Sequence, residues 1–165
     1  MKHFKLKSSD IDEAVRQIAQ QVQPTHFITL SLVQGLKIDS PNGVAMWAKG
    51  DDVIYNDTYT KFVRCLSKSV VTPAVWKRHK PHLANAGSIE GGSNGQRFHL
   101  HINIRKPDRM SNQAFEAAIK QTAEGNPWIM NGHYAVDIRR ISGIEHQVGS
   151  VGYSSKRGLD RICIA

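Results

Sequence analysis

Apolar and polar residues alternate strictly along the stretch 97–104. Its even positions are apolar and its odd positions after Arg97 are polar, which is the two-residue period of a half-buried strand. The apolar set is Phe98, Leu100, Ile102 and Ile104, and the polar set is His99, His101 and Asn103. We therefore expect a strand here, with two histidines on its polar face.

Helical and strand patterns fill most of the remaining chain. Helices are predicted over 8–22, 51–70, 111–123 and 144–157, with Pro24 ending the first and Ser111 capping the third. Strands are predicted over 25–33, 86–90, 128–141 and 159–164, and a hairpin is predicted between 36–39 and 44–48. We expect residues 1–165 to form one α+β domain, in which a central antiparallel sheet of about five strands has helices packed on one face and the site on the other.

A carboxylate accompanies the two histidines. Residues 91–95 (GGSNG) have the composition of a turn, so the chain should form a hairpin that brings Glu90 close to His99 and His101. The two histidine Cα atoms would lie about 6.5–7 Å apart on the strand, and both imidazoles could reach one cation above the sheet. Histidine pairs on strand faces also occur as ordinary surface residues, and that alternative stays open.

A tyrosine and a lysine lie three residues apart in the last predicted helix. Tyr153 and Lys156 would share a helix face, and a neighbouring cation lowers the cost of forming phenolate. Tyr153 is therefore a candidate nucleophile, although an ordinary amphipathic helix would show the same spacing. Gly149 and Gly152 are unfavourable in a helix interior, which favours a short helix or one packed closely on the sheet.

Together these motifs resemble the HUH endonucleases, in the single-tyrosine branch of rolling-circle replication initiators (Rep proteins). His99-Leu100-His101 resembles their His-hydrophobe-His signature, and Tyr153-x-x-Lys156 resembles their nucleophile motif. Residues 27–32 (FITLSL) resemble their first-strand motif, and Glu90 resembles the acidic third metal ligand. The order of the motifs, over about 130 residues, suits this branch rather than the plasmid relaxases.

The resemblance implies a ferredoxin-like or RRM-like core and a specific chemistry. We expect a metal-dependent, site-specific endonuclease and strand transferase that initiates rolling-circle replication of a phage or plasmid through a covalent 5′-phosphotyrosine. The implied catalytic residues are Tyr153 and Lys156, and the implied ligands of Mn²⁺ or Mg²⁺ are His99, His101 and Glu90. The expected substrate is single-stranded or hairpin origin DNA.

Composition adds a charge argument. The formal net charge is +8 and the pI is about 9.7, which favours a phosphate-rich partner through counterion release. The run Lys77-Arg78-His79-Lys80 beside Trp76 is typical of a single-strand binding edge or of a solvated face. Trp47 could stack on a base, but we expect it in the core. The candidate DNA contacts are Gln96, Arg97, Arg105, Lys106, Lys77, Arg78, Lys80 and Arg157.

The remaining sequence features narrow the setting. The chain carries no run of eighteen apolar residues and no signal-peptide core, so we expect a cytoplasmic protein without a membrane partner, inside the host of a mobile element or virus. Cys65 and Cys163 are too few for a disulfide framework. Because no Gly-x-x-x-x-Gly-Lys-Ser/Thr loop is present, a separate helicase would have to act with the host replication machinery.

Two other functions remain open at this stage. One is a non-catalytic module that binds single-stranded DNA or RNA, in which the histidines and the tyrosine only stack or face solvent. The other is a metal-free two-histidine phosphoesterase built on His26 and the later histidines, whose motif requires Thr or Ser two residues after each histidine. Ile28, His101 and Asn103 hold those positions here, which argues against it.

Overall fold

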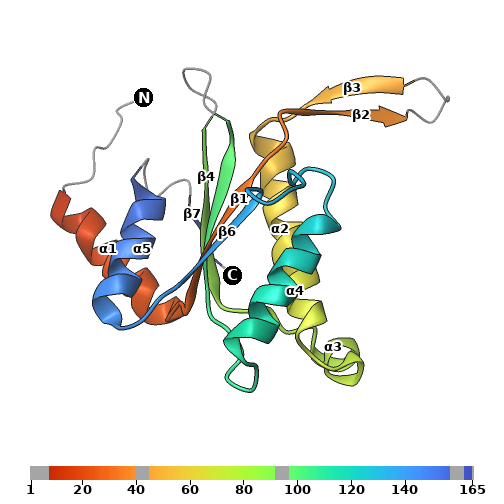
Figure 1. Cartoon of the computed structure of the whole chain (residues 1–165). Helices are drawn as coiled ribbons and strands as arrows, with labels where there is room; N and C mark the ends of the chain where they lie inside the picture. The colour runs from red at the N-terminus through yellow and green to blue at the C-terminus, as the bar shows by residue number, and fades with distance from the viewer. Residues whose placement is uncertain (1–7, 40–44, 92–96, 157–161, 165) are drawn as a thin grey trace.

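The computed structural model describes residues 8–39, 45–91, 97–156 and 162–164, which form an α+β domain (Figure 1). Five strands form an antiparallel sheet in the order β6-β1-β5-β4-β7, and β2 and β3 form a separate two-stranded ribbon. The elements are α1 (Ser8–Val22), β1 (His26–Ser31), β2 (Gly35–Asp39), β3 (Ala45–Lys49), α2 (Asp52–Ser69), α3 (Pro73–His79), β4 (Asn85–Glu90), β5 (His99–Ile104), α4 (Asn112–Glu124), β6 (Val136–Arg140), α5 (Ile144–Ser155) and β7 (Ile162–Ile164).

The connections of the central strands identify the architecture. The series β1, α2, β4, β5, α4, β6 is the β-α-β-β-α-β order of ferredoxin-like folds. In such a split unit the first two strands are separated by a third that runs opposite to both, and here β5 lies between β1 and β4. The predicted fold class, an α+β domain around an antiparallel sheet of about five strands, is confirmed.

One face of the sheet carries the main hydrophobic core. The helices α2 and α4 cover this face (Figure 1), and each begins at a side-chain cap: Asp51 accepts from the Ile54 amide and Ser111 accepts from the Ala114 amide. The alternation read from the sequence determines which strand residues face these helices. The fully buried large side chains of this core are Tyr55, Phe62, Phe115, Ile28, Leu30, Leu32, Leu66, Leu100, Ile102, Ile104, Ile119 and Ile129.

The other face of the sheet is partly covered by α1 and α5, which pack against each other through Val15, Ala19 and Val151 (Figure 1). The structure differs here from the expectation that the helices gather on one face. The helix that carries Tyr153, α5, lies on the face of the sheet that bears His99 and His101, and α1 packs against the apolar side of α5. The part of this face that α1 and α5 do not cover, over β1 and β6, lines an open cleft.

Two local predictions were wrong. Trp47 lies on β3 with 72% of its surface exposed, outside the core, because the β2–β3 ribbon projects away from the main sheet (Figure 1). The predicted strand 128–141 is regular only over β6, and Tyr134 is 91% exposed. Residues 128–135, just before β6, form turns and irregular backbone. They are joined to the end of β1 by a bridge between Ile129 and Leu32 and by backbone hydrogen bonds with Ser31 and Val33.

Within the part of the chain that the structure describes, no helix is both long and apolar enough to cross a lipid bilayer.

Candidate functional site

Both histidines of β5 face the side of the sheet that carries α5, and β1 holds their rings. The hydroxyl of Thr29 lies 3.1 Å from Nδ1 of His101, and the hydroxyl of Ser31 lies 3.5 Å from Nδ1 of His99. The antiparallel register creates both contacts, because Thr29 is paired with His101 and Ser31 with His99. The Nε2 atom of each ring is therefore left for other partners, and the ring centroids lie 6.3 Å apart.

Glu90 reaches the histidine pair from the end of β4, as the predicted hairpin requires. It is paired with His99 in the register, but its carboxylate hydrogen-bonds diagonally to Nε2 of His101, at 2.8 Å. The second carboxylate oxygen lies 2.7 Å from Nζ of Lys156. Glu90 thus links the strand motif directly to the helix motif.

Tyr153 approaches the same histidine from α5. Its ring meets the His101 ring edge-on with centroids 5.3 Å apart, and Phe27 of β1 contacts both rings. Nζ of Lys156 lies 4.0 Å from the centre of the Tyr153 ring. Tyr153 nevertheless remains 48% exposed, so a ligand in the cleft can reach it.

A buried hydrogen bond fixes α5 on the sheet. The side-chain amide of Asn103, the third polar residue of the β5 face, donates to the hydroxyl of Ser154 at 2.9 Å. Ser154 directly follows Tyr153, so this contact sets where the tyrosine lies along the strand. The Cβ that Gly152 lacks would lie 3.7 Å from Val15, which is ordinary contact, and Gly149 lines the open cleft.

The charges of the site stabilise one another. Burial opposes ionisation of Glu90, but hydrogen bonds from Lys156 and His101 outweigh it and lower the pKa of the carboxyl. The hydrogen bond to Glu90 raises the pKa of Lys156. Burial lowers the pKa of His101 despite the adjacent carboxylate. At neutral pH we therefore expect a neutral imidazole beside an ionised carboxylate and an ammonium group.

A cleft of about 1000 Å³ opens above these residues. It is lined by Glu90, His99, His101 and Tyr153, together with residues of β1, of β6 and of the start of α5. Arg139 points into this cleft and is paired with Asp137 at 2.9 Å. The other lining residues, which the predicted site did not include, are Phe27, Thr29, Gly91, Asp137, Arg139, Arg140, Ile141, Glu145, His146, Gly149 and Ser150. Phe27 and Thr29 belong to the first-strand motif 27–32, and alternation along β6 was the sequence signal for Asp137 and Arg139.

The predicted DNA contacts are dispersed over the molecule. Arg97 lines the cleft. Arg105 and Lys106 follow the far end of β5, where Arg105 bonds to Gln23 and Lys106 donates to the carbonyls of Pro107 and Met110. The structure thus does not bring these two residues to the site, although the sequence suggested that they flank it. Exposed Lys77, Arg78 and Lys80 belong to α3 and its cap, beside the end of α2 (Figure 1); Gln96 and Arg157 lie outside the described residues.

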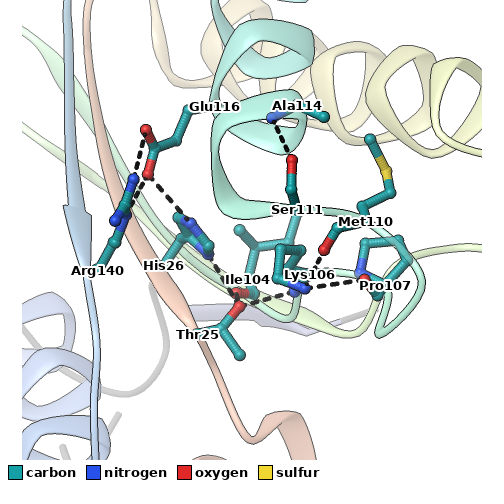
Figure 2. Close-up of polar contacts among 10 residues, drawn as sticks. All are labelled: Thr25, His26, Ile104, Lys106, Pro107, Met110, Ser111, Ala114, Glu116 and Arg140. Carbon is teal, nitrogen blue, oxygen red and sulfur yellow. Dashed lines mark hydrogen bonds and ion pairs between the residues drawn. The ribbon is translucent and has the colours of Figure 1, made fainter.

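A third histidine belongs to a different cluster on the opposite face of the sheet. His26 is 1% exposed and points toward α4, where its Nε2 lies 3.7 Å from Glu116 (Figure 2). Arg140 bonds to the same carboxylate, and the hydroxyl of Thr25 lies 2.9 Å from Nδ1 of His26. His26 and His101 thus face opposite sides of β1 and β5 and cannot act on one substrate atom.

The fit of a metal ion can be judged from the donor atoms. Within the described ranges, no group of three or more His, Cys, Asp or Glu side chains is already gathered around a point that could hold an ion. Two imidazoles and a carboxylate are nevertheless a donor set that suits Mn²⁺. The hydroxyls on Nδ1 of both histidines resemble the outer contacts that orient metal-binding imidazoles. A bound ion would replace the hydrogen bond between His101 and Glu90, because it would use the same two atoms.

Comparisons of the chain with protein-family models, with curated proteins and with solved structures found no match.

Proposed function

We propose that this protein is a metal-dependent, single-strand DNA endonuclease and strand transferase of the HUH type that initiates rolling-circle replication. One observation carries the proposal: Glu90, His99, His101 and Tyr153, predicted from two separate sequence motifs, line one cleft. Lys156 contacts both Glu90 and Tyr153 beside it. An ordinary surface histidine pair and an ordinary amphipathic helix would have no reason to share a carboxylate. The net charge of +8 supports a polyanionic substrate.

The ligands of the cation would be His99, His101 and Glu90. A divalent cation supplies charge neutralisation at the non-bridging oxygens of the scissile phosphate. Thr29 and Ser31 contact Nδ1 of the two imidazoles, so a cation would bind at Nε2 and, at His101, would replace the hydrogen bond to Glu90. Mn²⁺ suits the imidazoles best, and Mg²⁺ is the alternative.

Tyr153 would be the nucleophile. Its phenol oxygen releases its proton to solvent and forms a bond to phosphorus as the bond from phosphorus to the 3′ oxygen breaks. The departing oxygen takes up a proton from solvent to become a free 3′-hydroxyl, so the step has no net proton change. The 5′ end stays on the protein as a phosphotyrosine, so a later 3′-hydroxyl can reverse the step and rejoin the strand. Phe27 and His101 limit the positions of the ring, which favours a defined angle of attack.

Lys156 is positioned to act on the nucleophile. Its ammonium group contacts the Tyr153 ring and pairs with Glu90, so positive charge lies next to the group that must form phenolate. A charge fixed before the reaction stabilises the developing anion without reorganisation. Binding of a cation by Glu90 would release Lys156 toward the tyrosine or the phosphate.

The positions of these side chains argue against the two other functions, the two-histidine phosphoesterase and the non-catalytic binding module. A two-histidine phosphoesterase that uses His26 lacks support, because His26 is buried against α4 on the opposite face of the sheet. A non-catalytic binding module would need neither the link between Glu90 and Lys156 nor an exposed tyrosine beside it. That module remains the alternative if binding occurs without cleavage.

The proposal is tested with labelled single-stranded oligonucleotides of varied sequence and Mn²⁺. We expect cleavage that stops in chelator, together with a protein–DNA adduct on denaturing gels. Tight binding without cleavage in either metal would favour the binding module. Cleavage retained in chelator would instead support a metal-free phosphoesterase.

A further inference from the structure

The β2–β3 ribbon carries an exposed tryptophan between two lysines. In the ribbon register Trp47 lies opposite Lys37, and the next pair on the same face is Gly35 with Lys49. Both lysines are exposed, and Trp47 is 72% exposed. This face therefore presents one aromatic ring with a positive charge on each of two sides.

The tryptophan is held in place although it is exposed. A Cβ added to Gly35 would come within 2.7 Å of the Trp47 ring, so the indole lies directly against the backbone of β2. Only glycine leaves room for this approach. An indole that is restrained on one side and open on the other loses little freedom when a flat ligand stacks on it.

We propose that this face, formed by Lys37, Trp47 and Lys49, binds single-stranded DNA by stacking a base on Trp47 and pairing phosphates with the two lysines. Stacking on aromatic side chains combined with basic residues along the backbone is the common chemistry of sequence-tolerant single-strand binding. A protein partner would be the other occupant of an exposed tryptophan, but two flanking lysines favour a polyanion, and the further exposed apolar residue on that face, Ala45, is small. The apolar residues Ile38 and Met46 lie on the opposite face.

The ribbon begins close along the chain to the histidine pair, and it extends on the α2 side of the sheet (Figure 1). Ser31, whose hydroxyl contacts His99, is four residues before Gly35, so the two Cα atoms are at most about 14 Å apart. A few nucleotides would bridge the histidine pair and Trp47. The inference rests on the proposed function for the choice of DNA as the ligand, and it adds a second contact point outside the cleft.

The test measures the affinity of the full chain for a fluorescein-labelled oligothymidylate by anisotropy, in chelator so that no cleavage occurs. Trp47→Ala should weaken binding by about 5- to 100-fold, and Trp47→Phe should recover part of the loss. Lys37→Gln with Lys49→Gln should lower the slope of log affinity against log salt by about 1.4. Trp76→Ala and Lys77→Gln with Lys80→Gln alter the same residue types on α3, the competing candidate DNA contact, and should weaken binding less than the ribbon variants do.

The outcomes separate this inference from the nuclease proposal. Unchanged affinity of Trp47→Ala overturns the ribbon site, even if Tyr153 forms a DNA adduct. A loss confined to the α3 variants also overturns it and assigns binding to α3. A loss confined to the ribbon variants supports the site, even if no adduct with Tyr153 ever forms and the nuclease proposal fails.

Discussion

The ring of Tyr153 stands edge-on to the ring of His101, with centroids 5.3 Å apart and planes at 85°. Neither residue is near the other in sequence, and the contact exists only because α5 packs on the polar face of β5. The same packing places Lys156 on Glu90. A candidate nucleophile and a candidate metal site therefore share one rigid support.

Thr29 should control how well His101 binds a cation. Its hydroxyl contacts Nδ1 of His101 at 3.1 Å, and loss of such an outer contact typically costs about 10- to 100-fold in metal affinity. We expect Thr29→Val, which keeps the shape of the side chain, to weaken Mn²⁺ binding by that factor while the protein stays folded. Isothermal titration measures the affinity, and circular dichroism checks the fold. An unchanged affinity would mean that Thr29 does not orient His101 for metal binding.

Glu90→Gln removes the charge that connects the two motifs. We expect strand cleavage to fall by at least about 100-fold, because a ligand and the partner of Lys156 are lost together. Glu145→Gln is the matched control, since Glu145 lines the same cleft without contacting either motif. Single-turnover cleavage in Mn²⁺ compares the two variants, and equal losses would mean that only the overall charge of the cleft matters.

The same carboxyl should make stability depend on acid pH. The pKa of Glu90 is lowered in the folded protein by its hydrogen bonds to Lys156 and His101, which outweigh burial. Its stabilisation is therefore present above the unfolded pKa and is lost as pH falls through the folded pKa. Urea unfolding between pH 7 and pH 3 should show a smaller decrease for Glu90→Gln than for the unchanged protein. Parallel curves would contradict the ion pair with Lys156.

Ser154→Ala should loosen the tyrosine helix. The buried amide of Asn103 loses its closer acceptor, at 2.9 Å, and keeps only the Ser150 carbonyl at 3.5 Å. The full loss of a buried partner costs about 1–3 kcal/mol, which is the upper limit here. Ser155→Ala is the control, because the hydroxyl of Ser155 is also buried but bonds only to the Gly152 carbonyl of its own helix. Chemical unfolding should show a clearly larger loss for Ser154→Ala than for Ser155→Ala. If the two losses were equal, Asn103 would not be what fixes α5.

His26, on the opposite face of the sheet, should give a second test by pH. Burial lowers its pKa, against the pull of Glu116 and with help from Arg140 and Lys106. A histidine with a lowered folded pKa stabilises the protein above its unfolded value, near 6.5, and this contribution is lost as pH falls toward the folded value. We expect His26→Asn to reduce the decrease in unfolding free energy between pH 7.5 and pH 5.5. An unchanged slope would mean that His26 is protonated equally in both states.

The sequence was informative where the pattern is local. Alternation over 97–104 placed His99 and His101 on one face, and the cap at Ser111 began its helix as expected. The turn composition after Glu90 predicted the hairpin that carries its carboxylate to the pair. The spacing of Tyr153 and Lys156 placed them together on one side of α5.

Features that depend on tertiary packing could not be predicted from local sequence patterns. The diagonal bond from Glu90 to His101 rather than to its register partner His99 depends on Lys156, which holds the other carboxylate oxygen. The cleft wall on β6 comes from a strand whose pairing with β1 is long-range. Trp47 was expected in the core because large aromatic side chains usually are, but its ribbon extends beyond the sheet.

The most direct test of the central claim is mass spectrometry of the protein after incubation with single-stranded oligonucleotides and Mn²⁺. We expect a DNA adduct on the peptide that contains Tyr153, and we expect it to be absent in Tyr153→Phe and absent in chelator. Tyr134→Phe, which changes another exposed tyrosine, should keep the adduct. Cleavage without any adduct on Tyr153 would mean that water is the nucleophile and that this cleft is not a site of transesterification by tyrosine.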